Sequence, residues 1–497
     1  MIYYFHRKES IMAYRYGDDR KQAVLFPNTI DEYVSEDHPV RAYDAFIDSL
    51  DLEELGIIFN DKRVGNSAYD PRLMLKLLLY GYSYGIKSSR KLERETHQNL
   101  SFIWLMKNLK PDHKTIAEFR RKNMPVLKKT LKLCARLCLN LGLIDGNILF
   151  VDSTKLWANA GKRHEHNKKW YQKQLKLIDK RINSLLHECE LVDQREADKG
   201  SFVKMPQELA KEKRLKEKIQ NALAEFDERS ELTKEGKERK VNQVDPQSAQ
   251  MKSPQGTHPS YSVHSVMDDQ NGLIVHVDAV NEANDQNQLS KQIEGAENNL
   301  DHLCQVACAD AGYSNVEEFK QLDSNNRTII VPSQSQASDK EPGPFAKSRF
   351  SFNKEENCYY CPEGRRLIFK RFQDKAHKKL DYRTKNPSVC KNCIRYGICT
   401  KSKSGRTVVR HVSEELREKI EKVYDQPDSK EIYKRRKSKA EHPFGYIKKA
   451  TEFRQLSLRG RLGAQAESAI LATCFNIKRM MTLFGGVHQF IEKVATA

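Results

Sequence analysis

The chain has no long apolar stretch. No run within its 497 residues approaches the ~18 apolar residues that a membrane-spanning helix needs. Its first residues, MIYYFHRKES, also lack the apolar segment of a secretory signal peptide. These absences argue against a membrane partner and predict a cytoplasmic protein.

Acidic residues are too few to balance the basic ones. The sequence has 86 Lys and Arg against 67 Asp and Glu, which gives a net charge of +19 and a pI near 9.2. A surface with this excess attracts polyanions, so the composition predicts a nucleic-acid partner and association with the nucleoid. The length predicts roughly three or four domains of ordinary size.

The pattern of the 11 cysteines is not that of a disulfide scaffold. Outside residues 358–399 they lie in apolar surroundings, singly or at helix or strand spacing, where free thiols behave as small hydrophobic groups. These are Cys134, Cys138, Cys189, Cys304, Cys308 and Cys474.

The remaining cysteines cluster. Cys358 and Cys361 form one CxxC pair, Cys390 and Cys393 form a second, and Cys399 follows. Two such pairs are typical of a tetrahedral thiolate site for zinc. We therefore expect a structural Zn²⁺ held by Cys358, Cys361, Cys390 and Cys393. Unligated or redox-active thiols are the alternative, and the role of Cys399 stays open.

The helical and strand patterns divide the chain into blocks. Residues 29–123 carry a basic helical pattern, with a helix predicted to start at Asp70-Pro71. This block is either a bundle with a solvated basic face or a DNA-reading helical domain. Residues 164–239 predict a helical hairpin that serves packing or oligomerisation. Strand patterns at Tyr261–Val266 and Leu273–Val277 predict a β-hairpin.

Three carboxylates stand in settings that favour a shared site. Asp152 and Asp310 each follow a short apolar run of the kind that buried strands use, and Glu441 lies in a basic helical segment. A lone Asp after a strand is more often a helix cap or turn former. Because a carboxylate at a buried strand end needs a partner, and a divalent metal is a common one, the three together predict a metal site for phosphodiester chemistry.

The order of elements predicts an α/β core. A mixed sheet flanked by helices would bring Asp152 and Asp310 together, as in an RNase H-like nuclease core. An N-terminal all-α domain, a helical insertion and a cysteine-rich zinc-type insertion complete the expected fold. Asp278 also ends a predicted strand and is the rival for the role of Asp310.

At this point the chain resembles a known family, the DDE-type transposases of bacterial insertion sequences. The likeness covers nearly the whole chain: PDHKTIAEFRR looks like part of the helical domain before the core, VDSTKLWANA like the first-Asp motif, and ADAGYSN like the second. NEANDQNQL resembles the helix before the second Asp. YKRRKSKAEHPFGYIKK resembles the terminal signature, here Tyr433, Arg436, Glu441 and Lys448, with Arg436 one residue further from the Glu than is common in the family.

The resemblance implies a domain organisation. We expect an N-terminal helical DNA-binding domain at 1–125 and an RNase H-like catalytic core at 126–340 and 407–497. A helical hairpin at 160–245 and a cysteine-rich zinc-binding segment at 341–406 would be insertions into that core.

The resemblance also implies an activity. Such a protein binds the inverted ends of its insertion sequence and catalyses metal-dependent strand cleavage and strand transfer, as a dimer or higher oligomer on double-stranded terminal-repeat and target DNA. Asp152, Asp310 and Glu441 would be the catalytic residues and would hold two Mg²⁺, or Mn²⁺, ions. The DNA-binding residues would be Tyr433, Arg436, Lys448 and Lys449.

Two alternatives remain open at the level of sequence. The chain could be a catalytically inactive, sequence-specific DNA-binding protein, or a metal-dependent nuclease that cuts without joining strands. All three acids are present with their surrounding motifs, which weighs against inactivity.

Overall fold

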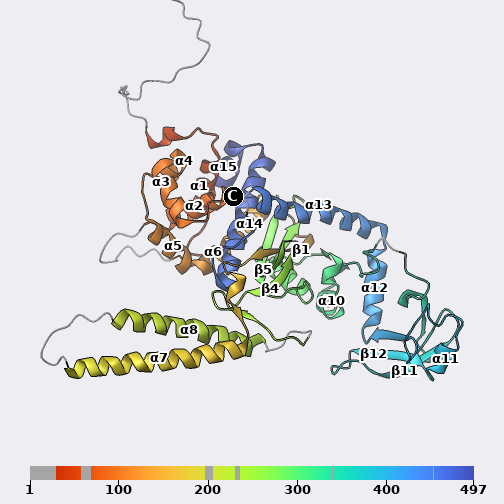
Figure 1. Ribbon diagram of the computed structural model, residues 1–497. Helices are drawn as coiled ribbons and strands as arrows, with labels where there is room; N and C mark the ends of the chain where they lie inside the picture. The colour runs from red at the N-terminus through yellow and green to blue at the C-terminus, as the bar shows by residue number, and fades with distance from the viewer. Residues whose placement is uncertain are drawn as a thin grey trace, which may run out of the picture.

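A computed structural model describes residues 29–57, 69–195, 205–229, 236–253, 255–338, 341–450 and 453–496. It has a mixed α/β architecture in which one central sheet is surrounded by helices, with further helices before it (Figure 1). The predicted class and the predicted N-terminal helices are confirmed at this level. Among the described helices, none combines the length and apolar character that crossing a bilayer requires.

The central sheet has six strands in a mixed arrangement. Its order is β4-β5-β1-β7-β8, and β6 pairs with β5 beside β4. β5 runs antiparallel to β1, β4 and β6, whereas β7 runs parallel to β1 and β8. The strands are β1 (Ile148–Trp157), β4 (Ala249–Ser253), β5 (Gly256–Asp268), β6 (Ile274–Val280), β7 (Val306–Ala309) and β8 (Thr328–Ile330).

The pairing of β5 with β6 is the predicted β-hairpin. Its strands pair from Ser262 opposite Val280 to Met267 opposite Ile274. Gly272 in the turn has a φ of +67°, a left-handed value that glycine adopts at little cost. The hairpin prediction is therefore confirmed.

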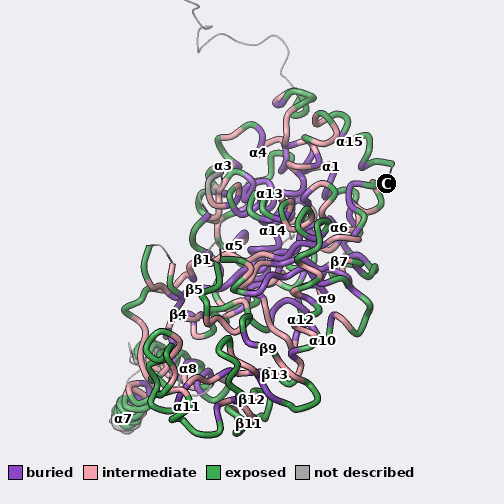
Figure 2. Tube along the Cα trace, turned by 90° about the vertical axis from the view of Figure 1, so that its right-hand side faces the viewer, coloured by how far each residue is buried: buried purple, intermediate pink, exposed green. Residues whose placement is uncertain are grey.

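The helices that pack on the sheet come from both ends of the chain. Figure 2 shows the buried residues concentrated in the strands and in the helix faces turned toward them. Helices α6 (Met124–Asn140), α9 (Leu289–Leu300), α10 (Val316–Asp323), α13 (Pro427–Ala450) and α14 (Gly460–Phe484) contact the strands of the sheet. The other helices here pack on helices; they are α1 (Pro39–Asp48), α2 (Pro71–Ser83), α3 (Ser89–Gln98), α4 (Leu100–Leu105), α5 (His113–Lys122) and α15 (Val487–Ala495). As predicted, α2 begins at Asp70-Pro71, where the Asp70 carboxylate accepts the Arg72 N–H at 2.7 Å.

The N-terminal helices and the sheet share one hydrophobic core through α14. A buried polar network fixes this junction: the Glu467 carboxylate accepts the Tyr82 hydroxyl at 2.7 Å and the backbone N–H groups of Ser457 and Leu458. The Arg120 guanidinium donates to the same Tyr82 oxygen. Since buried polar groups are costly unless they are paired, this network holds the N-terminal helices in one orientation on the core.

Two insertions project from the end of the core away from the N-terminal helices (Figures 1 and 2). The first is the predicted helical hairpin, α7 (Lys168–Arg195) and α8 (Met205–Arg229), which lies between β1 and β4 in sequence. At its base, β2 (Glu165–His166) pairs with β3 (Val241–Asn242). The hairpin has a small core of its own around Tyr171 and Phe226.

The second insertion is the cysteine-rich segment, a five-stranded antiparallel sheet. Its own buried core consists of Phe350, Tyr359, Leu367, Tyr382 and Val408. Its elements are β9 (Ser351–Asn353), β10 (Cys358–Tyr360), β11 (Arg366–Phe372), β12 (Lys379–Thr384), α11 (Ser388–Lys391) and β13 (Thr407–His411).

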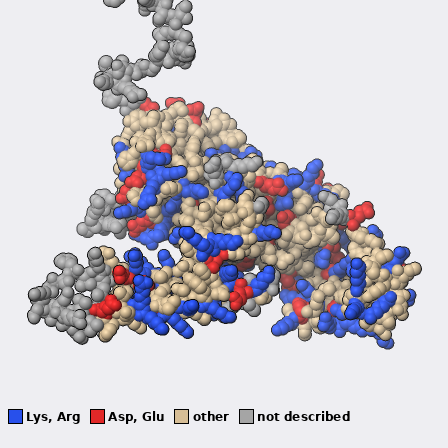
Figure 3. Space-filling model, viewed as in Figure 1, with Lys and Arg blue, Asp and Glu red and all other residues tan. Residues whose placement is uncertain are grey.

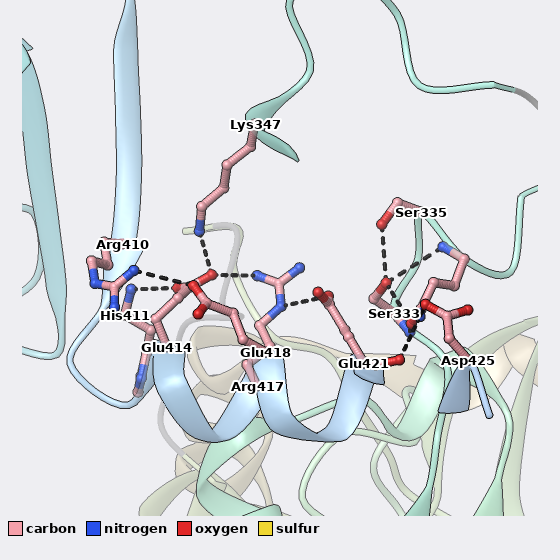
Figure 4. A network of polar contacts seen from close by, with 11 residues as sticks. Ser333, Ser335, Lys347, Arg410, His411, Glu414, Arg417, Glu418, Glu421 and Asp425 are labelled. Carbon is pink, nitrogen blue, oxygen red and sulfur yellow. Dashed lines mark hydrogen bonds and ion pairs between the residues drawn. The ribbon is translucent and has the colours of Figure 1, made fainter. Parts of the chain in front are cut away.

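Helix α12 (Glu414–Tyr424) joins this insertion to the core (Figure 4). On the insertion side, Glu414 pairs with Lys347 at 2.6 Å and Glu418 pairs with Arg410 at 3.3 Å. On the core side, α12 contacts the loop at 333–336 after β8. Helix α12 therefore links the insertion to the core through polar contacts, and α13 follows it directly in the chain.

Candidate functional site

The first two predicted acids lie side by side. In the parallel pair of β1 and β7, Val151 is opposite Ala309, so Asp152 and Asp310 are the next residues of adjacent strands. Neighbouring strands lie ~4.8 Å apart, which puts these two backbones in direct reach of each other. β1 does not end at Val151 as predicted but continues to Trp157, because β5 is long enough to pair with it along that whole length.

Helix α13 packs on β1, β5 and β7 and brings Arg436 to Asp152. Nη1 of Arg436 lies 3.9 Å from Oδ1 of Asp152, and Arg436 is only 8% exposed. An ion pair between Arg435 and Asp269 at 2.7 Å fastens the helix to the turn after β5. The guanidinium thus provides a positive charge beside the acids.

The third acid, Glu441, is close enough to affect Asp152 electrostatically. Burial raises the pKa of Asp152 to about 6, against the opposing effects of Arg436 and of the Ser153 N–H, and the charges of Asp310 and Glu441 raise it further. Glu441 itself is exposed on α13. The structure therefore gathers all three predicted acids in one region, with Asp152 16% exposed and Glu441 at the surface.

Three of the four predicted DNA-binding residues, Tyr433, Arg436 and Lys448, lie near these acids. Tyr433 is half-buried, with the Arg436 guanidinium 5.3 Å from its ring centre. The ammonium of Lys448 donates to the hydroxyl of Thr154 on β1, two residues beyond Asp152. The side chain of Lys449 lies outside the described part of the chain.

The rival acid, Asp278, is engaged elsewhere. Its carboxylate accepts a hydrogen bond from Gln465 and lies 3.6 Å from Arg461, both on α14. It is not among the charges that affect Asp152.

A fourth carboxylate, which the sequence analysis did not single out, also faces this region. Asp285 lies in the loop before α9, and its Oδ1 accepts the Ser153 hydroxyl at 2.7 Å. A Cβ added to Gly312 would lie 2.9 Å from Oδ1 of Asp310 and 3.4 Å from Oδ2 of Asp285, so both carboxylates face the same glycine. The segment NEANDQNQL that contains Asp285 was expected to belong to the helix before the second Asp. That expectation is wrong, because α9 begins only at Leu289 and the preceding residues form a loop.

Two buried side chains, His264 and Tyr313, lie next to these carboxylates. Nδ1 of His264 is hydrogen-bonded to the Tyr313 hydroxyl at 2.7 Å, and Nε2 lies 3.9 Å from Oδ1 of Asp285. Burial lowers the pKa of His264 to about 4, so the ring is neutral near pH 7. Burial raises the pKa of Tyr313, and the charges of Asp285, Asp152 and Asp310 raise it further. One phenol is thus close to three carboxylates.

The predicted zinc ligands are brought together in part. Cys361, Cys390 and Cys393 line a cavity of about 30 Å³ in the cysteine-rich insertion, and Cys399 lines it with them. Cys358 does not line this cavity. Its thiol is directed instead to the Glu356 carboxylate, 3.4 Å away.

As the side chains stand, no group of three or more His, Cys, Asp or Glu within the described ranges closes around a common metal position. The donor types nevertheless fit. Carboxylate oxygens suit Mg²⁺ or Mn²⁺, and the raised pKa of Asp152 reports a buried negative charge that lacks sufficient compensation. Thiols around a small cavity suit Zn²⁺.

Comparison with protein families gives two matches. Residues 28–122 match a transposase domain (DUF772), and residues 360–481 match a transposase DDE domain. The chain belongs to the DDE-type transposases of insertion sequences. Neither the curated proteins nor the solved structures contain a match to it.

The two matches cover different parts of this transposase. The first spans the helices from α1 to α5, and the second runs from the cysteine-rich insertion through α13 into α14. Glu441 falls inside the second match, whereas Asp152 and Asp310 fall outside both. The positions of those two acids rest on the sheet register and on their electrostatic coupling.

The buried charge of Asp152 predicts a pH-dependent stability effect. The folded-state pKa of about 6 exceeds the usual 3.8, so ionisation of Asp152 destabilises the metal-free fold as pH rises through 6 and has no effect below about 3.8. A shift of this size corresponds to ~3 kcal/mol. Asp152→Asn should therefore raise the thermal midpoint at pH 8 in EDTA, by a margin that shrinks toward pH 4.5.

Thermal melts across that pH range test this expectation. Exposed Glu431 on α13 provides the control, because Glu431→Gln should change the midpoint little at any pH. Added Mg²⁺ should stabilise the parental protein more than Asp152→Asn, since ligands stabilise the state that binds them. A gain that stays constant from pH 4.5 to 8 would contradict the buried-charge account.

Proposed function

We propose that this transposase binds the inverted ends of its element and catalyses metal-dependent DNA strand cleavage followed by strand transfer. The observation that carries the proposal is the gathering of Asp152, Asp310 and Glu441 where β1 and β7 lie side by side and α13 packs on them. These acids come from two adjacent strands and a late helix, so only the folded chain could assemble them.

The strand order supports an RNase H-like core. Without the short β4, the order is β6-β5-β1-β7-β8, with the β1-β5-β6 half antiparallel and the β1-β7-β8 half parallel. In such a mixed sheet, the boundary between the two halves lies at β1. The acid on that central strand, Asp152, is then the natural centre of the site.

The side chains can be assigned roles in this chemistry. Asp152 would contribute to both metal positions, with Asp310 and Glu441 each completing one. When bound, two divalent ions activate the attacking oxygen and stabilise the leaving oxygen of a phosphodiester. Released 3′ hydroxyl groups could be aligned at the same carboxylates, so cutting and joining would need a single site.

Basic side chains supply phosphate contacts around the acids. Arg436 is buried at the site, and neither its Nε nor its Nη1 has a hydrogen-bond partner within the described residues. A phosphate oxygen brought into the site would satisfy such unpaired donors. The ammonium of Lys448 on α13 reaches Thr154 on β1, two residues beyond Asp152. It would hold the next phosphates of the DNA backbone.

The wider surface fits a DNA partner. Figure 3 shows Lys and Arg side chains along the α7–α8 hairpin, over the N-terminal helices and over the cysteine-rich insertion. We infer that DNA contacts extend from the site to these three parts. Joining two element ends further requires at least a dimer on DNA.

The proposal is tested with labelled element ends, purified protein and Mg²⁺. The expected products are nicked or cut ends and, after longer incubation, ends joined to a second duplex. Cleavage without joining would favour a metal-dependent nuclease. Binding without cleavage would favour an inactive DNA-binding protein.

We also propose that the cysteine-rich insertion holds a structural Zn²⁺ ion. The thiols of Cys361, Cys390, Cys393 and Cys399 line one small cavity, and the negative charges that the first three can carry raise the pKa of Cys399, after the larger effect of burial. Four thiolates would close the coordination shell, which leaves a structural rather than a catalytic role.

Backbone groups around this cavity support a metal-binding geometry. The Arg365 N–H donates to Sγ of Cys361 at 3.2 Å, and the Arg406 N–H donates to Sγ of Cys390 at 3.5 Å. Gly405 has a φ of +81°, and a Cβ there would lie 3.1 Å from Sγ of Cys390. Hydrogen bonds of this kind stabilise thiolates. Because Cys399 lines the cavity and Cys358 does not, Cys399 replaces Cys358 in the ligand set that we propose.

A further inference from the structure

We propose that Asp285 is a fourth carboxylate of the metal centre, which binds a divalent cation together with Asp152 and Asp310 and is oriented by Ser153 and His264. This inference deepens the proposed function and rests on it for the nature of the centre. It names a residue outside the three acids that define the family.

The first argument is the position of Asp285 between Asp152 and Asp310. Its Oδ1 accepts the hydroxyl of Ser153, the residue that follows Asp152, at 2.7 Å. Its Oδ2 faces Gly312, as does Oδ1 of Asp310, which accepts the Gly312 N–H at 2.8 Å. Oδ1 of Asp285 thus faces Ser153, and Oδ2 faces Gly312. The Asp285 side chain is 26% exposed.

The second argument is a buried donor that lacks an acceptor. His264 is 0% exposed, and its Nε2 has no hydrogen-bond partner within the described residues. Because the Tyr313 hydroxyl is bonded to Nδ1, a neutral ring in which Nδ1 accepts carries its hydrogen on Nε2. Oδ1 of Asp285 lies 3.9 Å from this Nε2.

An unpaired buried N–H is costly, and this one would be satisfied by a small shift of Asp285. A carboxylate that binds a metal through one oxygen commonly accepts hydrogen bonds from nearby side chains on the other. Ser153 and His264 are both placed to donate to Oδ1, which would leave Oδ2 free for the cation. These contacts therefore favour a cation bound at Oδ2 of Asp285, on the side that faces Asp310.

Charge supports the same conclusion. Asp285 contacts both the residue that follows Asp152 and the glycine beside Asp310, and carboxylates this close repel one another unless a cation lies among them. Arg436 supplies positive charge on the Asp152 side. No ion pair with a Lys or Arg involves Asp285 in the described part of the chain, so its side of the cluster is the one left for a metal ion.

Mn²⁺ binding to the purified full-length transposase without DNA tests this inference directly. Electron paramagnetic resonance reports free Mn²⁺, so titration gives the affinity of the centre. Asp285→Asn should weaken Mn²⁺ binding by about 10-fold or more, in the range seen when metal-site residues are removed. Glu282→Gln, an exposed acid of the same loop, is the matched charge control and should stay within about 2-fold of the parental affinity.

The Mn²⁺ concentration that gives half-maximal end cleavage should rise by a similar factor in Asp285→Asn and not in Glu282→Gln. Ser153→Ala removes one donor to Asp285 without touching a carboxylate and should have a smaller effect of the same sign. If Asp285→Asn fails to fold, Ser153→Ala decides: weaker Mn²⁺ binding supports the assignment, and parental binding overturns it.

Failure of this inference can be told apart from failure of the proposed function. If Asp285→Asn binds Mn²⁺ as tightly as the parental protein while element ends are still cut, the fourth ligand is wrong and the transposase chemistry stands. If Mn²⁺ affinity falls as expected but no DNA is cut by the parental protein, the metal centre stands and the proposed reaction is wrong.

Discussion

Replacing Glu441 with Ala should lower the rate of end cleavage by about three orders of magnitude while leaving end binding nearly unchanged. Loss of one metal-holding carboxylate removes stabilisation of the charge that develops on the scissile phosphate, and ~4 kcal/mol of lost transition-state stabilisation corresponds to this factor. The measurement compares cleavage of labelled ends with a gel-shift titration of the same DNA.

The structure makes this variant a specific probe. Glu441 is exposed on α13, and no hydrogen bond or ion pair within the described residues involves its side chain, so its removal should cost little stability. Loss of a negative charge beside Arg436 and Lys448 should, if anything, tighten DNA binding at low salt. Glu431→Ala, an exposed acid on the same helix, should cut normally. Parental cleavage by Glu441→Ala would remove Glu441 from the catalytic set.

Two of the acids could be predicted from sequence because strand pattern and register act locally. The apolar runs that end at Val151 and Ala309 are opposite each other in the parallel pair, so the residues that follow them are neighbours. The position of the true end of β1 could not be predicted in the same way. Its extension to Trp157 depends on pairing with β5, a strand more than a hundred residues away in sequence.

The contacts of Asp285 and the unpaired Nε2 of His264 could not be predicted from the sequence, because both depend on tertiary structure. Asp285 lies in a loop without periodicity, and its position depends on Ser153 from one strand and Gly312 from another. His264 lies on a buried strand, where packing is the usual role of such a residue. Only the folded structure reveals that its Nε2 faces a carboxylate without a closer acceptor.

The CxxC spacing predicted a knuckle at Cys358 and Cys361, whereas the structure has a strand there. β10 includes Cys358, and successive side chains of a strand point to opposite faces. Tyr359 joins the core of the insertion, with Cys361 packed against it, and Cys358 faces the other way, toward Glu356. Spacing alone does not distinguish a turn that gathers two thiols from a strand that separates them.

This difference gives the second large effect that we expect. The purified transposase should carry about one Zn²⁺ per chain, Cys399→Ser should carry almost none, and Cys358→Ser should retain it. Each variant replaces one thiol of the same insertion with a hydroxyl group. Cys399 lines the cavity, whereas Cys358 is fully buried beside Glu356 and does not line it. Metal content measured by plasma mass spectrometry after gel filtration distinguishes them.

Loss of zinc should have a large effect, because few other interactions stabilise this insertion. Its own core has five buried hydrophobic residues, Phe350, Tyr359, Leu367, Tyr382 and Val408, and small units of this kind usually need a metal or disulfides for stability. Loss of zinc should therefore loosen the sheet formed by β9 to β13, which limited proteolysis detects as new cleavage within 341–406. Because α12 connects that sheet to α13, weaker end cleavage should accompany the loss. If Cys399→Ser keeps its zinc, or if Cys358→Ser loses it, the ligand set proposed from the cavity is wrong.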